Sequence, residues 1–522
     1  MQEEHKLHKQ YGTAKAWYTL NETIRSSLEG EWREAAQLTL PYVFPVENQA
    51  QGSLLPTPFN SIGPAAVNAL AAKLLLALLP PTGVFFRLLP DSEVIKDVPV
   101  ANLKQLDSEL AKIERNVIEY INQKAIRVSV FEAIKLLIIT GNVMIYKIPK
   151  GSFKIFSPYQ YVVQRDYVGN MLTSCIKERM SYKALPTKVQ EQLAKEHGDT
   201  LKHEQKETEV EQVDVYTFIV RESLDKYRVW QEIDGVIIVG TEKTYSEDKL
   251  PYITLRWSTV NNEDYGRGIV SQYIGDLRSL EGLTQTIVEG AGIAAMTIFG
   301  LKPGSTLQLE DLNNASSGEF VLGDLEREVS TLQVNKGADL QVPLQLIQQL
   351  EQRLARAFLM LSGQVRDSER TTAVEVRATA AELETTLGGV FSVLASEFQT
   401  PMIRLILQEM NPEVLKFTTP SITTGISAIS RERDYGNLNT MLQSIAQLGP
   451  DVIAQYLNIP AYLTQIATAL GMDPTAIVKS PEQIQQEQQQ AMQQQQSMMQ
   501  QEQQGQMQLA QTKQQGGQQA DV

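Results

Sequence analysis

Hydrophobic residues recur at intervals of three and four through most of the N-terminal part of the chain, which is the period of an amphipathic helix. Between residues 13 and 40 this spacing joins Trp17, Leu20, Ile24 and Leu28, and prolines come directly after. The same periodicity predicts helices at 13–40, 65–79, 103–122 and 126–140. The N-terminal part is therefore predicted to be mainly helical.

After Gly141-Asn142 the pattern changes to short runs of β-branched and aromatic residues separated by turn residues, which is typical of strands. Strands are predicted at 143–148, 153–156, 161–164, 213–220, 227–231 and 236–239. A polar segment at 183–209 interrupts them and has a helical pattern. Residues 1–270 are therefore predicted to form one mixed α+β domain.

The helical period returns at 271–297 and again at 341–361, where an apolar stripe predicts a helix about 30 Å long. Pro343 fits the first turn of the second helix, where its missing N–H is not needed. Turn signals such as Lys302-Pro303-Gly304 fill residues 298–338, so we expect a short β-like insert there. The order predicted for this region is helix, insert, helix.

The longest apolar stripe, over 372–410, predicts a helix that contains residues unfavourable to helices. Gly388, Gly389 and Pro401 lie inside it, and we expect kinks at these positions. Prolines punctuate 411–480, where short helices are expected. From 481 to 522, 21 of 42 residues are glutamine, a composition that cannot bury a core and predicts a flexible tail.

Composition limits the class of protein. The 522 residues carry a formal net charge of −14, whereas proteins that grip nucleic acid usually present a basic balance or face. Cys175 is the single cysteine, which excludes an intramolecular disulfide, and we expect it to be a buried structural thiol. The most apolar run, 65–79, is shorter than the roughly 20 residues that span a bilayer. It is predicted to be a buried helix, so no membrane segment is expected.

No run of residues matches a strong catalytic or metal-binding motif. The chain has no P-loop, and the dinucleotide-like pattern at 290–295 falls inside a predicted helix, where close helix packing explains it better. His203-Glu204 lacks the second histidine of a zinc protease. Asp276 and Glu281 share their helix with Arg278, which favours exposed ion pairs over acid–base catalysis. We therefore expect no enzymatic activity, no cofactor and no metal.

Several longer runs, in fixed order, carry a resemblance to a known family. They are AAKLLLALLP (71–80) after Thr57-Pro58, GNVMIY (141–146), YVVQRD (161–166), YGRGIVSQYIGDLRSLEGL (265–283) and ERTTAVEVRATAAELETTLGGVFSVL (369–394). Through them, residues 15–480 resemble the portal proteins of short-tailed phages of the autographivirus type. The sequence departs from the family pattern at 183–209, at 298–338 and in its short glutamine-rich tail.

The resemblance implies an α+β, mainly helical portal fold whose subunits form a twelve-subunit ring around a central channel. It divides the chain into wing (1–270), first stem helix (271–297), clip (298–338), second stem helix (339–361), channel loop (362–371), long kinked wing helix (372–410), helical crown (411–480) and glutamine-rich tail (481–522). Such a ring is the head-to-tail connector at one capsid vertex, through which DNA is packaged and ejected.

The same resemblance suggests where contacts would lie. In the channel loop they are Gln364, Val365, Arg366 and Arg370, and the two arginines would steady passing DNA. The alternative is that these arginines pair with their neighbours Asp367 and Glu369. Gly388 and Gly389 would form the helix kink. The clip docking surface would consist of Lys302, Glu310, Asp311, Glu319 and Arg327.

The partners implied are other copies of the chain, the major capsid and scaffolding proteins, the terminase motor, tail adaptor and internal core proteins, and double-stranded DNA held without sequence specificity. The location implied is the portal vertex of the virion, after assembly in the host cytoplasm. Two other functions stay open. A different structural virion protein, such as a tail adaptor or internal core protein, would lack a twelve-lobed ring with a central hole. A terminase or nuclease would show DNA-stimulated ATPase activity or an acidic metal cluster.

Overall fold

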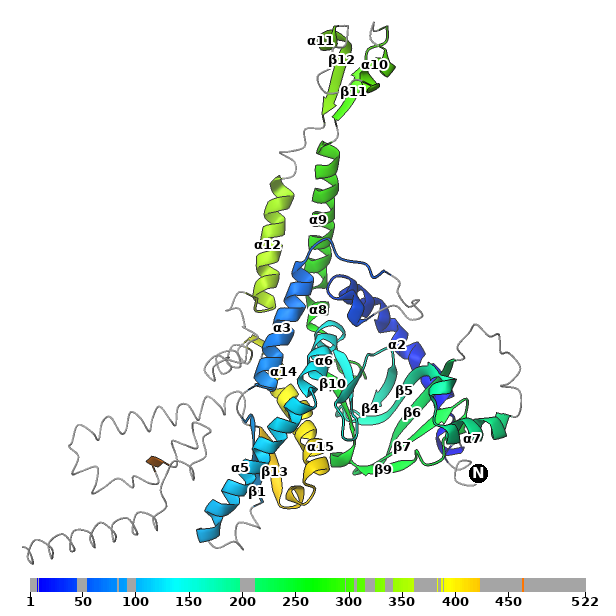
Figure 1. Cartoon of the computed structure of the whole chain (residues 1–522), viewed down its shortest axis with the longest axis vertical. Helices are drawn as coiled ribbons and strands as arrows, with labels where there is room; N and C mark the ends of the chain where they lie inside the picture. Colours follow the sequence, from blue (N-terminus) through cyan, green and yellow to red (C-terminus); the bar gives the residue numbers. More distant parts are fainter. Residues whose placement is uncertain are drawn as a thin grey trace, which may run out of the picture. The chain divides into compact units, whose positions relative to one another are not determined.

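A computed structural model of the chain gives the fold (Figure 1). The residues that it describes are 7, 9–44, 54–81, 84–91, 100–197, 212–295, 297–304, 308–314, 324–333, 341–360, 383, 386–387, 389–422 and 462–463. Contacts divide the chain into two units, of which one comprises Met1–Leu103 with Glu109–Gly425 and the other Lys104–Ser108 with Ile426–Val522. The first unit contains nearly all the described elements.

Four long helices in the N-terminal part confirm the helical periodicity. They are α2 (Ala14–Gln37), α3 (Ile62–Leu78), α5 (Val100–Gln123) and α6 (Ile126–Thr140). Thr13 caps α2, because its side-chain oxygen accepts a hydrogen bond from the Ala16 amide at 3.3 Å. Gly141 ends α6 with φ of 78°, and an added Cβ there would lie 2.3 Å from the backbone of Arg267. Only glycine fits that turn.

The largest sheet among the described residues has six antiparallel strands. Its strands are β4 (Tyr161–Arg165), β5 (Met171–Ser181), β6 (Gln212–Ser223), β7 (Lys226–Ile233) and β8 (Val236–Ile237), and β9 (Lys243–Ser246) pairs with β7. The strands expected at 161–164, 213–220, 227–231 and 236–239 are confirmed. Strand β5 was not expected, because its mixed apolar and polar sequence hides the alternation.

Helices cover both faces of this sheet. Alternate residues of β6, among them Tyr216 and Phe218, pack with Tyr18 of α2, whereas Val213 and Val215 pack on the other face with Leu193 of α7 (Thr187–His197). Cys175 of β5 is fully buried beneath α2, as expected for a structural thiol. Burial, followed by the charge of the nearby Glu232, raises the pKa of this thiol well above its ordinary value.

The six-stranded sheet and the helices α2, α3, α5, α6 and α7 together are called the body below. Two smaller sheets join further segments, distant in sequence, to this body. In the first, β10 (Tyr252–Arg256), β2 (Asn142–Lys147) and β3 (Phe153–Phe156) pair antiparallel, as expected for β2 and β3. In the second, β1 (Phe86–Pro90) pairs with β13 (Thr418–Ile422). The expectation of short helices throughout 411–480 is therefore wrong at 418–422. Residues 1–270 also do not close the α+β domain alone, because a C-terminal strand completes one of its sheets.

The helix expected at 372–410 is described from Gly389 onward, where α14 (Gly389–Leu394) leads into a π-helical segment, η5 (Ala395–Gln399), and then α15 (Thr400–Met410). The change to wider turns occurs directly before Pro401, which lacks the amide donor that a regular α-helical hydrogen bond requires. The interruption predicted from Pro401 is thus present as a π segment. Gly388 lies outside the described residues.

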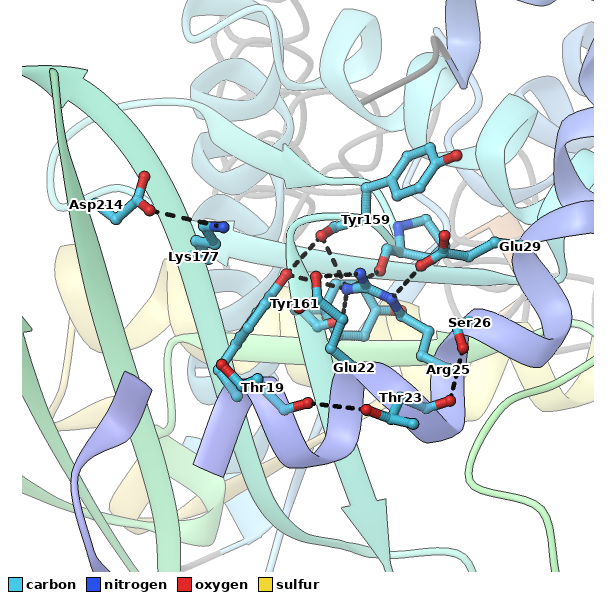
Figure 2. A network of polar contacts seen from close by, with 12 residues as sticks. Thr19, Glu22, Thr23, Arg25, Ser26, Glu29, Tyr159, Tyr161, Lys177 and Asp214 are labelled. Carbon is cyan, nitrogen blue, oxygen red and sulfur yellow. Dashed lines mark hydrogen bonds and ion pairs between the residues drawn. The ribbon is translucent and has the colours of Figure 1, made fainter. Parts of the chain in front are cut away.

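A fully buried arginine anchors α2 to the sheet. Arg25 donates hydrogen bonds to the main-chain oxygens of Pro158 at 3.0 Å, Tyr159 at 2.8 Å and Tyr161 at 3.2 Å, and to the hydroxyl of Tyr18 at 3.0 Å (Figure 2). Glu29 and Glu22, one turn to either side on α2, pair with the same guanidinium at 3.0 Å and 3.1 Å. These contacts satisfy the buried charge and hold α2 against the loop between β3 and β4.

Candidate functional site: the α9–α12 helix pair and its two ends

Helices α9 (Ile274–Ala295) and α12 (Gln341–Ala357) lie side by side and confirm the two helices expected on either side of the insert (Figure 1). Leu280 and Leu354 are buried where the pair meets the body, and Arg353 of α12 contacts Asp276 of α9 at 3.1 Å. Farther along, Ile293 of α9 and Leu346 of α12 are about half exposed. Much of the apolar stripe of each helix is therefore open to solvent in the single chain.

Residues from two other segments hold the base of the pair. Arg278 of α9 donates to the carboxylate of Glu34 in α2 at 2.6 Å and 2.8 Å. Glu281 accepts hydrogen bonds from the amides of Phe59 and Asn60 at 2.6 Å and 3.0 Å. The ion pairs expected of Asp276 and Arg278 thus exist, but each runs to another helix. Glu281 binds main-chain amides, and no local pattern indicates that role.

The C-terminal end of α12 is fixed by a buried lysine. Lys73 of α3 is 3% exposed and donates through Nζ to the main-chain oxygen of Leu359 at 2.8 Å. Leu359 itself has φ of 58°, and the neighbouring Phe358 packs on Tyr273 with ring centroids 5.7 Å apart. A lysine donating to carbonyls at a helix C-terminus also suits the negative end of the helix dipole. These contacts fix Phe358 and Leu359 directly after α12.

The insert between the helices folds around a two-stranded antiparallel sheet, β11 (Thr297–Leu301) with β12 (Val329–Gln333). The β-like expectation is confirmed for these strands. Two short helices, α10 (Leu309–Asn314) and α11 (Leu325–Glu328), were not expected. Their segments are too short for periodicity to distinguish them from turns.

The candidate clip residues fall on different parts of this insert. Lys302 is exposed in the turn after β11, and its amide donates to the main-chain oxygen of Glu328 at 3.0 Å. Glu310 is exposed on α10, which also carries Asp311. Arg327 is exposed on α11, with its Nε 3.8 Å from Asp324. The strand pairing thus brings Lys302 and the α11 end together, whereas Glu319 lies outside the described residues.

The candidate channel-loop residues Gln364, Val365, Arg366 and Arg370 lie outside the described residues, as does Gly388 of the expected kink; Gly389 is the first residue of α14. The small residues at 290–292 lie in α9, as expected. For Gly292, however, an added Cβ would meet no atom of the described residues within 4 Å. The expectation of close packing at this glycine is therefore wrong for the described part of the chain.

Two neighbouring arginines lie where the π segment meets the sheets, and periodicity did not predict them. Arg165 and Arg256 both donate to the main-chain oxygen of Gly169, at 2.9 Å and 3.5 Å. Burial, followed by the positive charge of Arg256, lowers the pKa of Arg165 to about 10. Burial raises the pKa of Glu397, in η5, although both arginines act in the opposite direction. The three charged residues are distant in sequence, so only the fold brings them together.

In the described part of the chain, no three histidine, cysteine, aspartate or glutamate side chains gather closely enough to hold a metal ion. No helix within that part combines the length and apolar character needed to cross a membrane. The geometry of the region is instead that of an elongated helix pair with a small sheet-containing insert at one end and a fixed helix terminus at the other.

The chain is similar to known proteins over most of its length. The family model described as "Bacteriophage head to tail connecting protein" matches residues 12–478. The portal protein of Enterobacteria phage T3 is 35% identical over 476 residues, which cover 89% of this chain and 88% of that protein. The portal protein of Escherichia phage T7 is 34% identical over 478 residues, with the same coverage of each chain. The portal protein of Pseudomonas phage phiKMV is 31% identical over 86% of this chain and 88% of its own length.

Among solved structures, the chain resembles one described as "Neck of empty GTA particle computed with C6 symmetry", with a TM-score of 0.38 and 11% identity over 80% of this chain and 91% of that chain. At this TM-score and identity, the likeness does not identify a family. The family model and the portal proteins, by contrast, match most of the chain, and the portal proteins do so at 30% identity or more. The chain therefore belongs to the portal proteins, the head-to-tail connecting proteins of short-tailed bacteriophages.

Proposed function

We propose that this chain is the repeating subunit of a closed portal ring, at one vertex of a phage capsid, through which genomic DNA is packaged and later ejected. The observation that carries the proposal is the match of residues 12–478 to the connector family. The half-exposed apolar residues of α9 and α12 support it, since a ring offers every subunit a neighbour to cover them.

We assign the sheet-containing body to the wing, α9 and α12 to the stem, and the insert carrying β11 and β12 to the clip. We further assign residues 362–371 to the channel loop and 372–410 to the long wing helix. We assign the crown to the part of 411–480 that follows β13, since Thr418–Ile422 pairs with β1. The tail, 481–522, adds no core-forming residues, so its deletion should leave the ring intact.

The negative net charge is better suited to a channel through which DNA passes than to a surface that binds DNA tightly. Each copy contributes a net charge of −14, which disfavours lasting attachment of a phosphate backbone. Arg366 and Arg370 of the channel loop would offer each passing phosphate a weak contact, of about 1 kcal/mol or less for exposed charges. Contacts of that strength steady a strand without stopping it.

The clip residues Lys302, Glu310, Asp311, Glu319 and Arg327 form the proposed docking surface, first for terminase and then for tail adaptor proteins. Capsid and scaffolding proteins would contact the wing, and internal core proteins would contact the crown. The ring would be assembled in the host cytoplasm and remain in the virion. The proposed role is structural, with no reaction catalysed and no cofactor required.

The first test is the mass of the purified protein. We expect a particle of twelve 58.3 kDa subunits at micromolar concentration, with a central hole and twelve lobes in negative-stain images. A monodisperse monomer would contradict the proposal. DNA-stimulated ATP hydrolysis by the purified chain would favour a motor enzyme instead.

The second test concerns DNA. Changing Arg366 and Arg370 together to Ala should preserve rings and procapsids while reducing packaged or retained DNA. A matched control removes two positive charges elsewhere, at the exposed residues Arg179 and Lys226 of the six-stranded sheet. If the loop variant packages and retains full-length genomes as the control does, the channel loop is not the element that contacts DNA.

A further inference from the structure

Directly before α3, the chain forms an exposed apolar segment, residues 54–59 with the sequence LLPTPF, which we call the arm. Leu54 is 96% exposed and Phe59 is 53% exposed. The arm contains no charged residue, and Pro56 and Pro58 restrict its backbone. A stiff apolar segment loses little conformational freedom on binding, so it is suited to insertion into an apolar surface.

The base of the arm is fixed on one face of the helix pair. The amides of Phe59 and Asn60 donate to the carboxylate of Glu281 on α9. The Asn60 side chain reaches Thr284 of α9 at 3.4 Å and Glu351 of α12 at 3.3 Å. These contacts bridge both helices, so they define the face on which the arm lies.

The opposite face of the same pair carries a groove of about 540 Å³. Its wall on α9 includes Gly282, Leu283 and Thr286, and its wall on α12 includes Leu346 and Leu350. The two arginines at its rim, Arg278 and Arg353, are already paired with Glu34 and Asp276. The groove is therefore apolar without an uncompensated positive charge, and its volume accommodates aliphatic side chains.

Helix geometry separates the arm from this groove within one chain. At about 100° per residue, Thr286 points roughly 140° away from Glu281 around α9, and Leu346 is similarly displaced from Glu351 around α12. The arm starts on the face of Glu281 and Glu351 and remains exposed there. An arm and a groove on opposite faces of one subunit are the complementary halves of a head-to-tail contact, which yields a ring when the rotation from one copy to the next closes.

We propose that the arm of each copy inserts into the α9–α12 groove of the next copy. The inference rests on the proposed ring and names the surfaces that join its subunits. The occupant is a second copy of this chain, because the chain itself supplies an uncharged apolar arm opposite an apolar groove. A tail, scaffolding or other apolar peptide in the same groove is the competing occupant, and disulfide trapping between paired variants distinguishes the two.

The first experiment fills the groove. An added Cβ at Gly282 meets no atom within 4 Å, so Gly282→Leu is tolerated by the subunit but blocks the groove for an arm. Gly292→Leu is the matched control, since Gly292 is equally unobstructed but lies about three turns beyond Glu281, on the face of α9 opposite the groove. We expect Gly282→Leu to raise the protein concentration for half-assembly at least tenfold, and Gly292→Leu to change it less than twofold. Equal behaviour of the two variants would overturn the proposal.

The second experiment detects the contact itself. Leu54→Cys combined with Leu346→Cys should give, on mild oxidation of purified rings, a ladder of disulfide-linked multimers in denaturing gels without reductant. Cys175 is fully buried, so it contributes little background. Each single variant, and the pair Leu224→Cys with Leu346→Cys, should stay monomeric in the gel, because Leu224 is also highly exposed but lies on the distant β6–β7 turn. A ladder from the Leu224 pair, or none from the Leu54 pair, contradicts the arm contact.

The third experiment tests whether the contact joins the arm of one copy to the groove of another. The variant Leu54→Asp/Leu55→Asp has a charged arm and an unchanged groove. The variant Leu346→Asp/Leu350→Asp has a charged groove and an unchanged arm. Each alone should be monomeric, and an equimolar mixture should form dimers that cannot grow. If wild-type protein forms no ring, the proposed function fails; if wild-type rings form and the mixture behaves like either variant alone, only the arm inference fails. Protection of the groove by an added scaffolding or tail peptide, with no ladder, would assign it to that partner.

Discussion

The sheet-containing body and the α9–α12 pair both contain amphipathic helices, yet the apolar residues of the two regions differ in exposure. In the body, Trp32, Trp230 and Phe398 are almost fully buried. In α12, Leu354 and Ala355 are the buried residues, and Val342 and Leu346 remain substantially open to solvent. Among the described residues, the apolar face of a body helix is covered by its own chain, whereas that of α12 is left partly uncovered.

The two regions also differ in the exposure of their charged side chains. The body contains Arg25, Lys147 and Glu232 at low exposure, and each binds groups from segments distant in sequence. In the helix pair, the ion pairs between Arg278 and Glu34 and between Arg353 and Asp276 are substantially exposed. Exposed pairs contribute about 1 kcal/mol or less. The buried charges of the body are thus compensated within the chain, whereas in the proposed ring the helix pair would gain further stabilisation on association.

The largest expected effect concerns the π-helical segment that joins α14 to α15. Phe398 lines a small apolar cavity together with Leu78, Val130 and Leu255, so Phe398→Ala enlarges the void between α3, α6 and β10. We expect a loss of about 4 kcal/mol in unfolding free energy. Urea unfolding followed by tryptophan fluorescence measures it, with the half-exposed Val393→Ala as control. A loss below about 1 kcal/mol would show that residues 389–410 are not part of the body core.

The second effect removes the polar anchor of α2. Arg25→Met keeps much of the side-chain volume but removes the guanidinium that donates to the buried main-chain oxygens of Pro158, Tyr159 and Tyr161 and to the Tyr18 hydroxyl. We expect a loss of about 3 kcal/mol, because the guanidinium is fully buried and solvent does not screen its contacts. Arg179→Met is the control, since its pair with Asp214 is half exposed and should contribute less than about 1 kcal/mol. Similar losses for both variants would contradict the role given to Arg25.

The third effect is a pH dependence at the contact between α5, β2 and α15. Burial opposes the charge of Glu409, but hydrogen bonds from Tyr120, the Lys150 amide and Lys147 hold the pKa of its carboxylate below its ordinary value. A lowered pKa in the folded state stabilises the protein above the ordinary carboxylate range, and that stabilisation is lost as pH falls through the folded-state pKa.

Glu409→Gln should therefore cost about 1.5 kcal/mol near neutral pH and progressively less as the pH is lowered through the carboxylate range. Unfolding free energies measured from neutral pH down through that range test this. Glu413→Gln is the control, because Glu413 pairs with Lys416 at the surface. A constant difference between Glu409→Gln and wild type at all pH values would assign the effect to packing.

Periodicity predicted the long elements well because their signals extend over many residues. Helices α2, α3, α5, α6, α9 and α12 all occur where apolar spacing placed them. Strand β5 and the pairing of β1 with β13 were missed. The first alternates irregularly around Lys177 and Glu178, which find partners in Asp214 and Lys154 on other strands. The second joins segments more than 300 residues apart, which no local pattern reports.

The candidate site was predictable to the same extent. The sequence identified the helix pair and its insert, since helical period and turn residues are local. It did not identify Lys73 at the end of α12 or Glu281 beneath the arm. A lysine inside an apolar run and a glutamate beside an arginine have ordinary surface explanations, and only the fold reveals that they bind main-chain atoms of another segment.

The smallest expected effect on unfolding free energy concerns the exposed apolar face of α12, and it tests the difference between the body and the helix pair. Leu346 is 45% exposed, so Leu346→Gln removes little buried apolar surface from its own subunit. In subunits dissociated by dilution, we expect the unfolding free energy to change by less than about 0.5 kcal/mol. The concentration for half-assembly, measured by mass photometry, should nevertheless rise several-fold.

The control is Leu280→Gln, at a buried position of the same pair. Here the larger effect should fall on the subunit itself, with a large loss in its unfolding free energy. If Leu346→Gln instead destabilises the isolated subunit as much as Leu280→Gln does, the apolar face of α12 is covered within one chain, and the difference between body and helix pair disappears.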